Sequence, residues 1–172
     1  MNIDLNEILP KDFSQNSKVW IYQASRKLSL QHVLYADSLL QDFVENWQSH
    51  GAPVKGFATI LFGQFIILMA DESASTVGGC STDSSVRIVK QIEQETGISM
   101  FDRQLLAFHV DDTVQLLPMP QLVPALSSGK INGDTIYFNN TVLSKAKLMT
   151  DWMIPLSTSW LASKMKLADV KV

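Results

Sequence analysis

The residue types that could carry chemistry gather in one segment of the sequence, positions 71–85, where an apolar run ends and a helical pattern begins. Asp71 and Glu72 open the segment, two glycines that would let the backbone approach a ligand follow, and Cys80, the single cysteine of the chain, comes next. The N-terminus of a helix presents free N–H groups and partial positive charge, which favour an anion or a thiolate. We therefore expect a functional site here, with Cys80 and Asp71 as the candidate catalytic residues.

Cys80 has two interpretations. As a nucleophile or redox thiol it would have a lowered pKa, and His50 or His109 would be its base. Against this, nothing in the spacing requires a histidine near the thiol, and a lone cysteine more often behaves as a small buried apolar residue. The cysteine count also excludes an internal disulfide bond.

The acidic residues of the segment also have two interpretations. Asp71, Glu72 and Asp83 offer the hard oxygen ligands that a divalent cation takes in phosphoryl chemistry. The alternative, which we favour, is that residues 81–83 cap the helix and that Asp71 and Glu72 are solvated at the end of a strand. The histidines and the cysteine form neither a CxxC nor an HxxxH pattern, so no metal site is predicted.

Two arginines are candidates for ligand binding. Arg103 follows Asp102 directly, and a guanidinium binds a carboxylate or a phosphate through two parallel hydrogen bonds. An ion pair between Arg103 and Asp102 or another acid near a sheet edge is the alternative, and it would contribute little if exposed. Arg26, just after the first predicted strand, has the same two interpretations. The predicted ligand contacts are therefore Arg103, Asp83, Glu72, His50 and Arg26, and the sequence indicates no particular cofactor.

The composition is typical of a folded globular protein. The 172 residues are 46% hydrophobic and 18% charged, which provides enough apolar material for one domain with a sizeable core. With 14 Lys plus Arg against 17 Asp plus Glu, the net charge of −3 gives no general attraction to nucleic acid or anionic lipid. No apolar stretch approaches the ~18 residues of a membrane span, and no basic-then-apolar leader opens the chain, so we expect a cytoplasmic protein.

The sequence can be searched for the phosphate-binding motif of nucleotide-binding proteins. The segment 51–56 has the two glycines of a phosphate loop at the right interval, but Phe57 and Ala58 stand where Lys and Ser or Thr are required. Around Lys130 both the first glycine and the hydroxyl residue of the motif are missing. Neither segment is a Walker A motif, and we expect no bound nucleotide.

Hydrophobic periodicity predicts a single α+β domain over 18–172, preceded by an N-terminal arm over 1–17 that docks on its own domain or on a second copy. The predicted order is strand, helix, strand, strand, helix, strand, which is typical of a ferredoxin-like (βαββαβ) antiparallel sheet with both helices on one face. An extra strand extends this sheet, whose core covers 18–118. The predicted strands are 18–23, 55–62, 64–70, 103–110 and 113–117, and the predicted helices are 30–48 and 84–96.

The pattern weakens after residue 118, and we interpret 119–172 as a C-terminal helical elaboration that packs on the same sheet. Trp152 and Trp160 are expected to anchor it, because two such large rings gain most from burial. The predicted pieces are a strand at 135–138 and short helices around 121–128, 142–150 and 157–165.

Six short segments carry a resemblance to a known family. They are VWIYQASR (19–26), FVENWQSHG (43–51), MADE (69–72), GGCSTDSSV (78–86), MFDR (100–103) and TIYFNN (135–140). Together they resemble a family of small uncharacterised proteins of the Bacteroidetes that genome annotation often labels "ABC transporter ATPase". The resemblance implies no established activity, substrate or catalytic residue. The label is contradicted by the residues, because the chain has neither a phosphate loop nor an LSGGQ-type signature.

The sequence therefore favours a non-enzymatic protein without ATPase activity, which binds an unidentified protein partner or assembles with itself. The reason is that no complete catalytic motif accompanies the predicted fold. The alternative is a small hydrolase or transferase centred on the 71–83 segment and Arg103. That alternative predicts a pocket in which Cys80, Asp71 and Arg103 converge.

Overall fold

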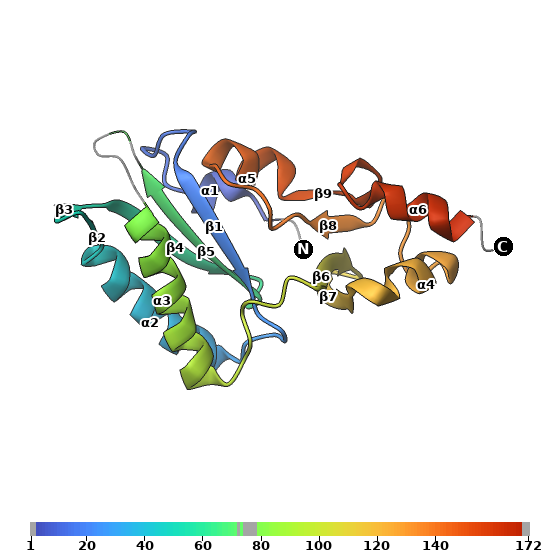
Figure 1. Ribbon diagram of the computed structural model, residues 1–172, viewed down its shortest axis with the longest axis horizontal. Helices are drawn as coiled ribbons and strands as arrows, with labels where there is room; N and C mark the ends of the chain where they lie inside the picture. The colour runs from blue at the N-terminus through green and yellow to red at the C-terminus, as the bar shows by residue number, and fades with distance from the viewer. Residues whose placement is uncertain (1–2, 72, 74–78, 170–172) are drawn as a thin grey trace.

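The computed structural model describes residues 3–71, 73 and 79–169, and its two main antiparallel sheets lie side by side (Figure 1). The first sheet has the strand order β1–β5–β4 and consists of β1 (Lys18–Gln23), β5 (Phe65–Asp71) and β4 (Lys55–Leu61). Every residue of β5 is buried. A tight hairpin joins β4 to β5, and β5 is the central strand of the sheet, with apolar side chains on both faces.

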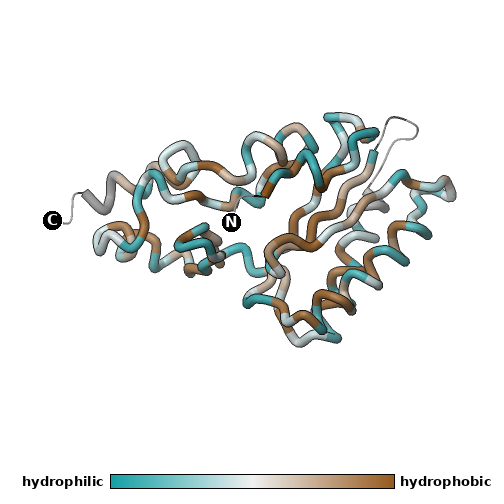
Figure 2. Tube along the Cα trace, turned by 180° about the vertical axis from the view of Figure 1, so that it is seen from behind, coloured by the Kyte–Doolittle hydropathy of each residue, from teal (hydrophilic) through white to brown (hydrophobic). Residues whose placement is uncertain are grey.

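The side chains of β5 alternate between two hydrophobic cores, one on each face of the first sheet. Phe65, Ile67 and Met69 point into a core that is shared with the N-terminal arm and the C-terminal third of the chain. The residues between them point to the opposite face, which α2 (Leu30–Glu45) and α3 (Gly79–Thr96) cover. The predicted placement of both helices on one face is therefore confirmed. Figure 2 shows the strands of this sheet as a continuous hydrophobic stretch between more polar surfaces.

The centres of the two helices are where the sequence predicts them, but one end of each differs. Ser29 is the N-cap of α2, since its side chain accepts a hydrogen bond from the N–H of His32 at 3.2 Å. The helix ends at Glu45 and not at 48, because the chain turns at His50 and Gly51 to pair β2 (Gln48–Ser49) with β3 (Ala52–Pro53). The other helix, α3, begins at Gly79, five residues before the predicted start.

The second sheet has the strand order β7–β6–β8–β9 and joins the middle of the chain to its C-terminal third. Asp111 and Asp112 form the turn of its first hairpin, and both residues have the left-handed φ, 48° and 55°, that a two-residue hairpin turn requires. The strands are β6 (Leu105–Val110), β7 (Thr113–Pro118), β8 (Ile136–Phe138) and β9 (Met153–Pro155). On one face a third core packs against α4 (Leu122–Ser127) and α6 (Ala162–Asp169). Among the helices of the described part of the chain, none is long and apolar enough to span a membrane.

The α+β class is confirmed, whereas the ferredoxin-like arrangement with one extended sheet is not what the structure has. That arrangement places β6 beside β1, but β6 pairs with β7 and β8 in the separate second sheet. The physical reason is that the chain after β8 already occupies the start of the outer edge of β1: Lys18 forms an antiparallel bridge with Ser144. The sequence predicts a boundary at residue 118 between a sheet core and an elaboration packed on it. In the structure this boundary falls within the second sheet, because strands from both sides of residue 118 belong to it.

The N-terminal arm packs on its own domain, on the face of the first sheet opposite α2 and α3. Leu9 and Phe13 are buried there, after the short helix α1 (Leu5–Ile8) and beside α5 (Lys145–Asp151). Trp152, which follows α5, is fully buried in the same core, as predicted. Trp160 is 53% exposed, so its predicted role as a buried anchor is wrong.

Candidate functional site

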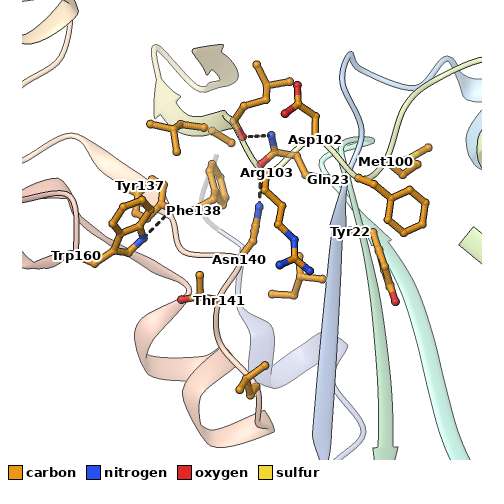
Figure 3. Close-up of a pocket in the computed structure, with 16 residues that line it drawn as sticks. Tyr22, Gln23, Met100, Asp102, Arg103, Tyr137, Phe138, Asn140, Thr141 and Trp160 are labelled. Carbon is orange, nitrogen blue, oxygen red and sulfur yellow. Dashed lines mark hydrogen bonds between the residues drawn. The ribbon is translucent and has the colours of Figure 1, made fainter. Parts of the chain in front are cut away.

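A pocket of about 380 Å³ lies between the two sheets, along the outer edge of β1, and we call it the edge pocket. Its walls come from residues 21–23 of β1, from the segment 100–107 that leads into β6, and from β8 with the residues after it (Figure 3). Neighbouring residues of a strand point to opposite faces of the sheet. Because three consecutive residues of β1 line this pocket, it runs along the strand edge and not over one face.

The lining is mainly apolar and aromatic. Tyr22 packs edge-on against Phe101 with ring centroids 5.5 Å apart, and its hydroxyl lies 2.8 Å from the Ser85 hydroxyl. Burial raises the pKa of Tyr22, although the Ser85 hydrogen bond and the charge of Arg103 act in the opposite direction. On the opposite wall the indole N–H of Trp160 donates to the hydroxyl of Tyr137 at 3.3 Å. The pocket therefore offers ring surfaces on two sides.

A chain of hydrogen-bonded polar groups crosses from one sheet to the other at this pocket. The side-chain amide of Gln23 donates to the carbonyl oxygen of Leu105 at 2.9 Å, and that of Asn140 donates to Gln23 Oε1 at 2.8 Å. The indole N–H of Trp152 donates to Asn140 Oδ1 at 3.0 Å. Because Gln23 is only 8% exposed, these bonds satisfy a polar group that would otherwise be buried without partners.

Arg103, which is exposed like Arg26, supplies the positive charge of the edge pocket. In Figure 3 its side chain extends between Asn140 on one side and Tyr22 on the other. Within the described residues, no carboxylate lies within 4.0 Å of its guanidinium. The adjacent Asp102 accepts a hydrogen bond from the N–H of Gln104 at 2.8 Å, so its carboxylate stabilises a turn. The predicted ion pair between Arg103 and Asp102 is thus not formed.

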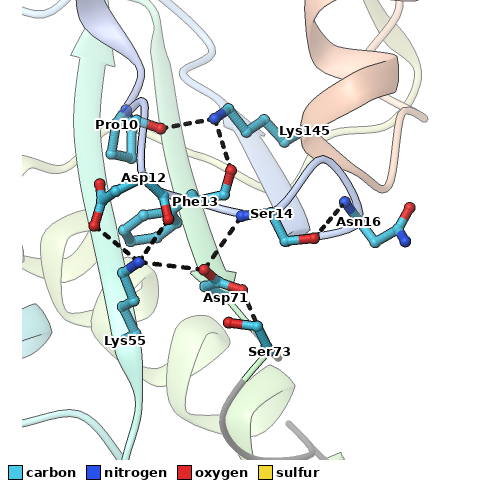
Figure 4. A network of polar contacts seen from close by, with 9 residues as sticks. All are labelled: Pro10, Asp12, Phe13, Ser14, Asn16, Lys55, Asp71, Ser73 and Lys145. Atoms are coloured by element: carbon cyan, nitrogen blue, oxygen red, sulfur yellow. Dashed lines mark hydrogen bonds and ion pairs between the residues drawn. The ribbon is translucent and has the colours of Figure 1, made fainter.

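Asp71 lies at the other end of the first sheet and holds the N-terminal arm (Figure 4). Its carboxylate accepts hydrogen bonds from the N–H groups of Ser14, at 3.2 Å, and Ser73, at 3.0 Å, and forms an ion pair with Lys55 at 3.3 Å. Burial alone would raise the pKa of Asp71, but these bonds outweigh it and hold the pKa below its ordinary value. Lys55 also pairs with Asp12 of the arm at 2.8 Å.

The structure does not bring Asp71 and Arg103 together. Gln23, which lines the edge pocket, pairs across the sheet with Phe65, whereas Asp71 ends the same strand six residues later. At 3.3 Å per residue this separation is about 20 Å. The solvated strand end that the sequence favours for Asp71 is also wrong, because the residue is 2% exposed.

The other predicted site residues lie apart from the edge pocket. His50 is exposed in the β2–β3 turn with a φ of 51°, and Arg26 is exposed in the loop after β1. Asp83 is exposed on α3. Glu72 lies outside the described residues, and so does the side chain of Cys80, whose backbone is part of the first turn of α3.

No cluster of three or more His, Cys, Asp and Glu side chains that could hold a metal ion occurs in the part of the chain that the structure describes. Sequence patterns missed Tyr22 and Gln23 as pocket residues. One signal for a polar site was available: Gln23 is a polar residue at the end of the otherwise apolar strand segment VWIYQ. Comparisons with family models, curated proteins and solved structures find no match to this chain.

Proposed function

We propose that this protein is a binding protein whose edge pocket holds an organic anion with an apolar body. One observation carries the proposal: the guanidinium of Arg103 extends into an apolar, aromatic pocket and has no carboxylate partner among the described residues. A guanidinium in such surroundings favours a carboxylate, sulfonate or phosphate, and the rings favour a flat or branched apolar group.

This proposal keeps the non-enzymatic interpretation of the sequence. The alternative hydrolase or transferase at 71–83 has no support from the described residues, because Asp71 is engaged by the arm and lies far from Arg103. Three of the six segments that resemble the Bacteroidetes family, 19–26, 100–103 and 135–140, contribute to the edge pocket. We propose the same class of ligand for that family. We also propose that its members have no ATPase activity.

The test uses 8-anilinonaphthalene-1-sulfonate (ANS), a fluorescent apolar anion, and N-phenyl-1-naphthylamine, which is the same molecule without the sulfonate. Hydrogen bonds to a charged group contribute about 1.5–3 kcal/mol, and 1.4 kcal/mol corresponds to about a tenfold change in affinity. We expect Arg103→Gln to weaken ANS binding about tenfold and to leave binding of the neutral amine unchanged.

Arg26→Gln is the matched control, since Arg26 is an exposed arginine outside the edge pocket. It should leave the affinity for both dyes as in the wild type. Equal ANS affinity of the wild type and Arg103→Gln would contradict the proposed function.

A further inference from the structure

We propose that the occupant of the edge pocket is an extended peptide segment that adds to β1 as a further strand and places a carboxylate on Arg103. This inference rests on the proposed function and names the class of its ligand. Its basis is the backbone of β1, which has unpaired hydrogen-bonding groups where the strand borders the pocket.

The backbone hydrogen bonds of β1 show which residues face outward. Val19 N–H donates to the carbonyl of Leu143 at 3.1 Å, and Lys145 N–H donates to the carbonyl of Ser17 at 3.0 Å. Residues with odd numbers therefore direct their N–H and C=O groups to the outer edge. Those with even numbers face β5, in agreement with the bond from Ala24 N–H to Gln64 at 2.8 Å.

The outer edge is paired at its start and again just after its end, where Ser25 N–H donates to the carbonyl of Ser99 at 2.7 Å, and it is open between these pairs. The chain after β8 covers residues 17–19, but beyond Val19 the outward groups of Ile21 and Gln23 have no backbone partner in the described residues. The strand that a ferredoxin-like sheet would place here belongs to the second sheet. An edge of this kind is a ready template for another strand.

The surroundings of the open edge suit a peptide better than a compact small molecule. Donors and acceptors that recur at every second residue match the backbone of an extended chain, whose side chains then alternate between two sides. Leu143 and Trp160, at 73% and 53% exposure, also line the pocket and offer apolar surface to such side chains. The open stretch of three residues corresponds to about 10 Å, the length of a short strand.

Charge complementarity supplies the remaining feature of the occupant. Arg103 has no carboxylate partner within the described chain, so a segment that brings its own carboxylate would satisfy it. The carboxylate can be an Asp or Glu side chain or the free end of a polypeptide. Both present the same group to a guanidinium.

The experiment measures displacement of ANS from the full-length protein by a library of acetylated pentapeptides. Their alternate positions carry Val, Ile, Leu, Phe or Thr, and the library is made in four forms, with and without an internal Asp or Glu and with a C-terminal acid or amide. We expect peptides with a carboxylate to displace the dye and those without one to bind at least about tenfold more weakly. The acid and amide forms then identify the source of the carboxylate.

Two changes test the backbone pairing directly. In the best peptide, N-methylation of alternate residues should abolish binding at the positions that face β1 and leave it unchanged at the others. In the protein, Ile21→Pro removes an outward N–H that β5 does not use, and proline is tolerated on edge strands in that orientation. This variant should keep its ANS affinity within about threefold, which is well under 1.4 kcal/mol, and lose peptide binding.

The outcomes separate the two proposals. If ANS binding depends on Arg103 but no peptide displaces the dye, the inference is overturned and the proposed function stands. If peptides bind equally whichever amides are methylated, strand addition is overturned. If ANS binding is independent of Arg103, both proposals fail. The inference is supported if peptide binding needs the carboxylate and is lost on N-methylation at alternate positions. This support does not depend on whether Ile21→Pro folds.

Discussion

Lys145 is a buried lysine, 4% exposed, that holds the N-terminal arm from the side of α5. Its ammonium donates to the carbonyl oxygens of Pro10 at 2.7 Å and Phe13 at 2.9 Å (Figure 4). We expect Lys145→Met to lower the free energy of unfolding by about 2–3 kcal/mol, because a hydrogen bond to a charged group contributes about 1.5–3 kcal/mol and two carbonyls lose their donor. Urea denaturation followed by circular dichroism measures the difference.

Lys147→Met is the matched control on the same helix. The Lys147 side chain is 62% exposed and pairs with Asp151 at 2.8 Å, four residues further along. Exposed pairs of this spacing contribute about 0.3–0.5 kcal/mol, so the control should be nearly as stable as the wild type. Equal losses in the two variants would show that the buried contacts to the arm contribute nothing beyond an exposed pair.

Asp71 should make stability depend on pH. Because its folded-state pKa lies below the ordinary value, the carboxylate stabilises the fold fully above about pH 4, and this contribution is lost as the pH falls through the folded-state pKa. At pH 7 we expect Asp71→Asn to cost about 1–2 kcal/mol, since an amide cannot accept from both Ser14 and Ser73 on its two ends. Urea denaturation between pH 7 and pH 2.5 should show the two proteins converging in acid.

Asp83→Asn, on the exposed surface of α3, is the control for this series. It should follow the wild type at every pH. A constant difference between the wild type and Asp71→Asn down to pH 2.5 would mean that the charge of Asp71 has no part in holding the arm.

At the scale of single residues, the sequence predicts roles that depend on near neighbours. Ser29 is recognisable as a cap because its partner, His32, is three residues away. The partners of Asp71 are not recognisable, since Lys55 and Ser14 are 16 and 57 residues distant. Arg103 is predicted as a ligand contact and does line the edge pocket, but the amides and rings around it come from distant segments.

At the scale of elements, the contact between α2 and β4 depends on Gly56. A β-carbon at this position would lie 2.7 Å from Cε3 of Trp47, which is buried near the end of α2 and packs on Trp20 and Phe43. We expect Gly56→Ala to cost about 1–3 kcal/mol, in the range of overpacked cores, and to change the near-ultraviolet circular dichroism of the tryptophans. In a Trp47→Leu background the cost should shrink, because the clashing ring is gone.

Gly97→Ala is the matched control for a glycine in another role. Gly97 has a φ of 63° after the end of α3 and open space around it, so the substitution strains only the backbone, by about 1 kcal/mol. Its near-ultraviolet spectrum should remain that of the wild type. A spectrum altered equally by both substitutions, or a cost of Gly56→Ala that Trp47→Leu leaves unchanged, would contradict the predicted clash.

Helices and strands with strong periodicity are predicted well, and their ends are not. The apolar spacing that defines α2 continues to Trp47, yet this ring lies beyond the helix and is buried mainly against the sheet, at Trp20, Gly56 and Ala70. The β2–β3 turn is hard to predict because a residue other than glycine, His50, takes the first left-handed position before Gly51, and such residues adopt positive φ only uncommonly. The early start of α3 has no sequence signal, since glycine is a poor helix former.

At the scale of the whole molecule, the core opposite α2 and α3 is made from three distant parts of the chain. Phe65 of β5 packs against Phe138 at 4.7 Å and Trp152 at 5.3 Å, and the arm adds Leu9 and Phe13. We therefore expect a fragment of residues 18–118 not to fold alone. Its near-ultraviolet circular dichroism and cooperative heat transition should be absent, whereas the full chain shows both. A cooperative transition of the fragment would refute this.

The α+β class could be predicted because it follows from the order of the elements, but the division into two sheets could not. Strand pairing is a non-local choice, and nothing in the alternation of 105–110 says whether its partner is β1 or β8. The short strand 136–138 looks marginal in isolation. It becomes part of a four-stranded sheet only because the β6–β7 hairpin offers it an edge.

The indole of Trp152 has a consequence for the edge pocket, since its N–H can donate and cannot accept. Asn140 must turn its oxygen toward that N–H, which leaves its nitrogen for Gln23, and Gln23 must then aim its own nitrogen at Leu105. The donor-only indole at one end and the acceptor-only carbonyl of Leu105 at the other end thus fix the orientation of both amides, so a ligand meets donors and acceptors in the same places. With phenylalanine instead of Trp152, the carbonyl of Leu105 alone would set this order, and Asn140 Oδ1 would lose its donor.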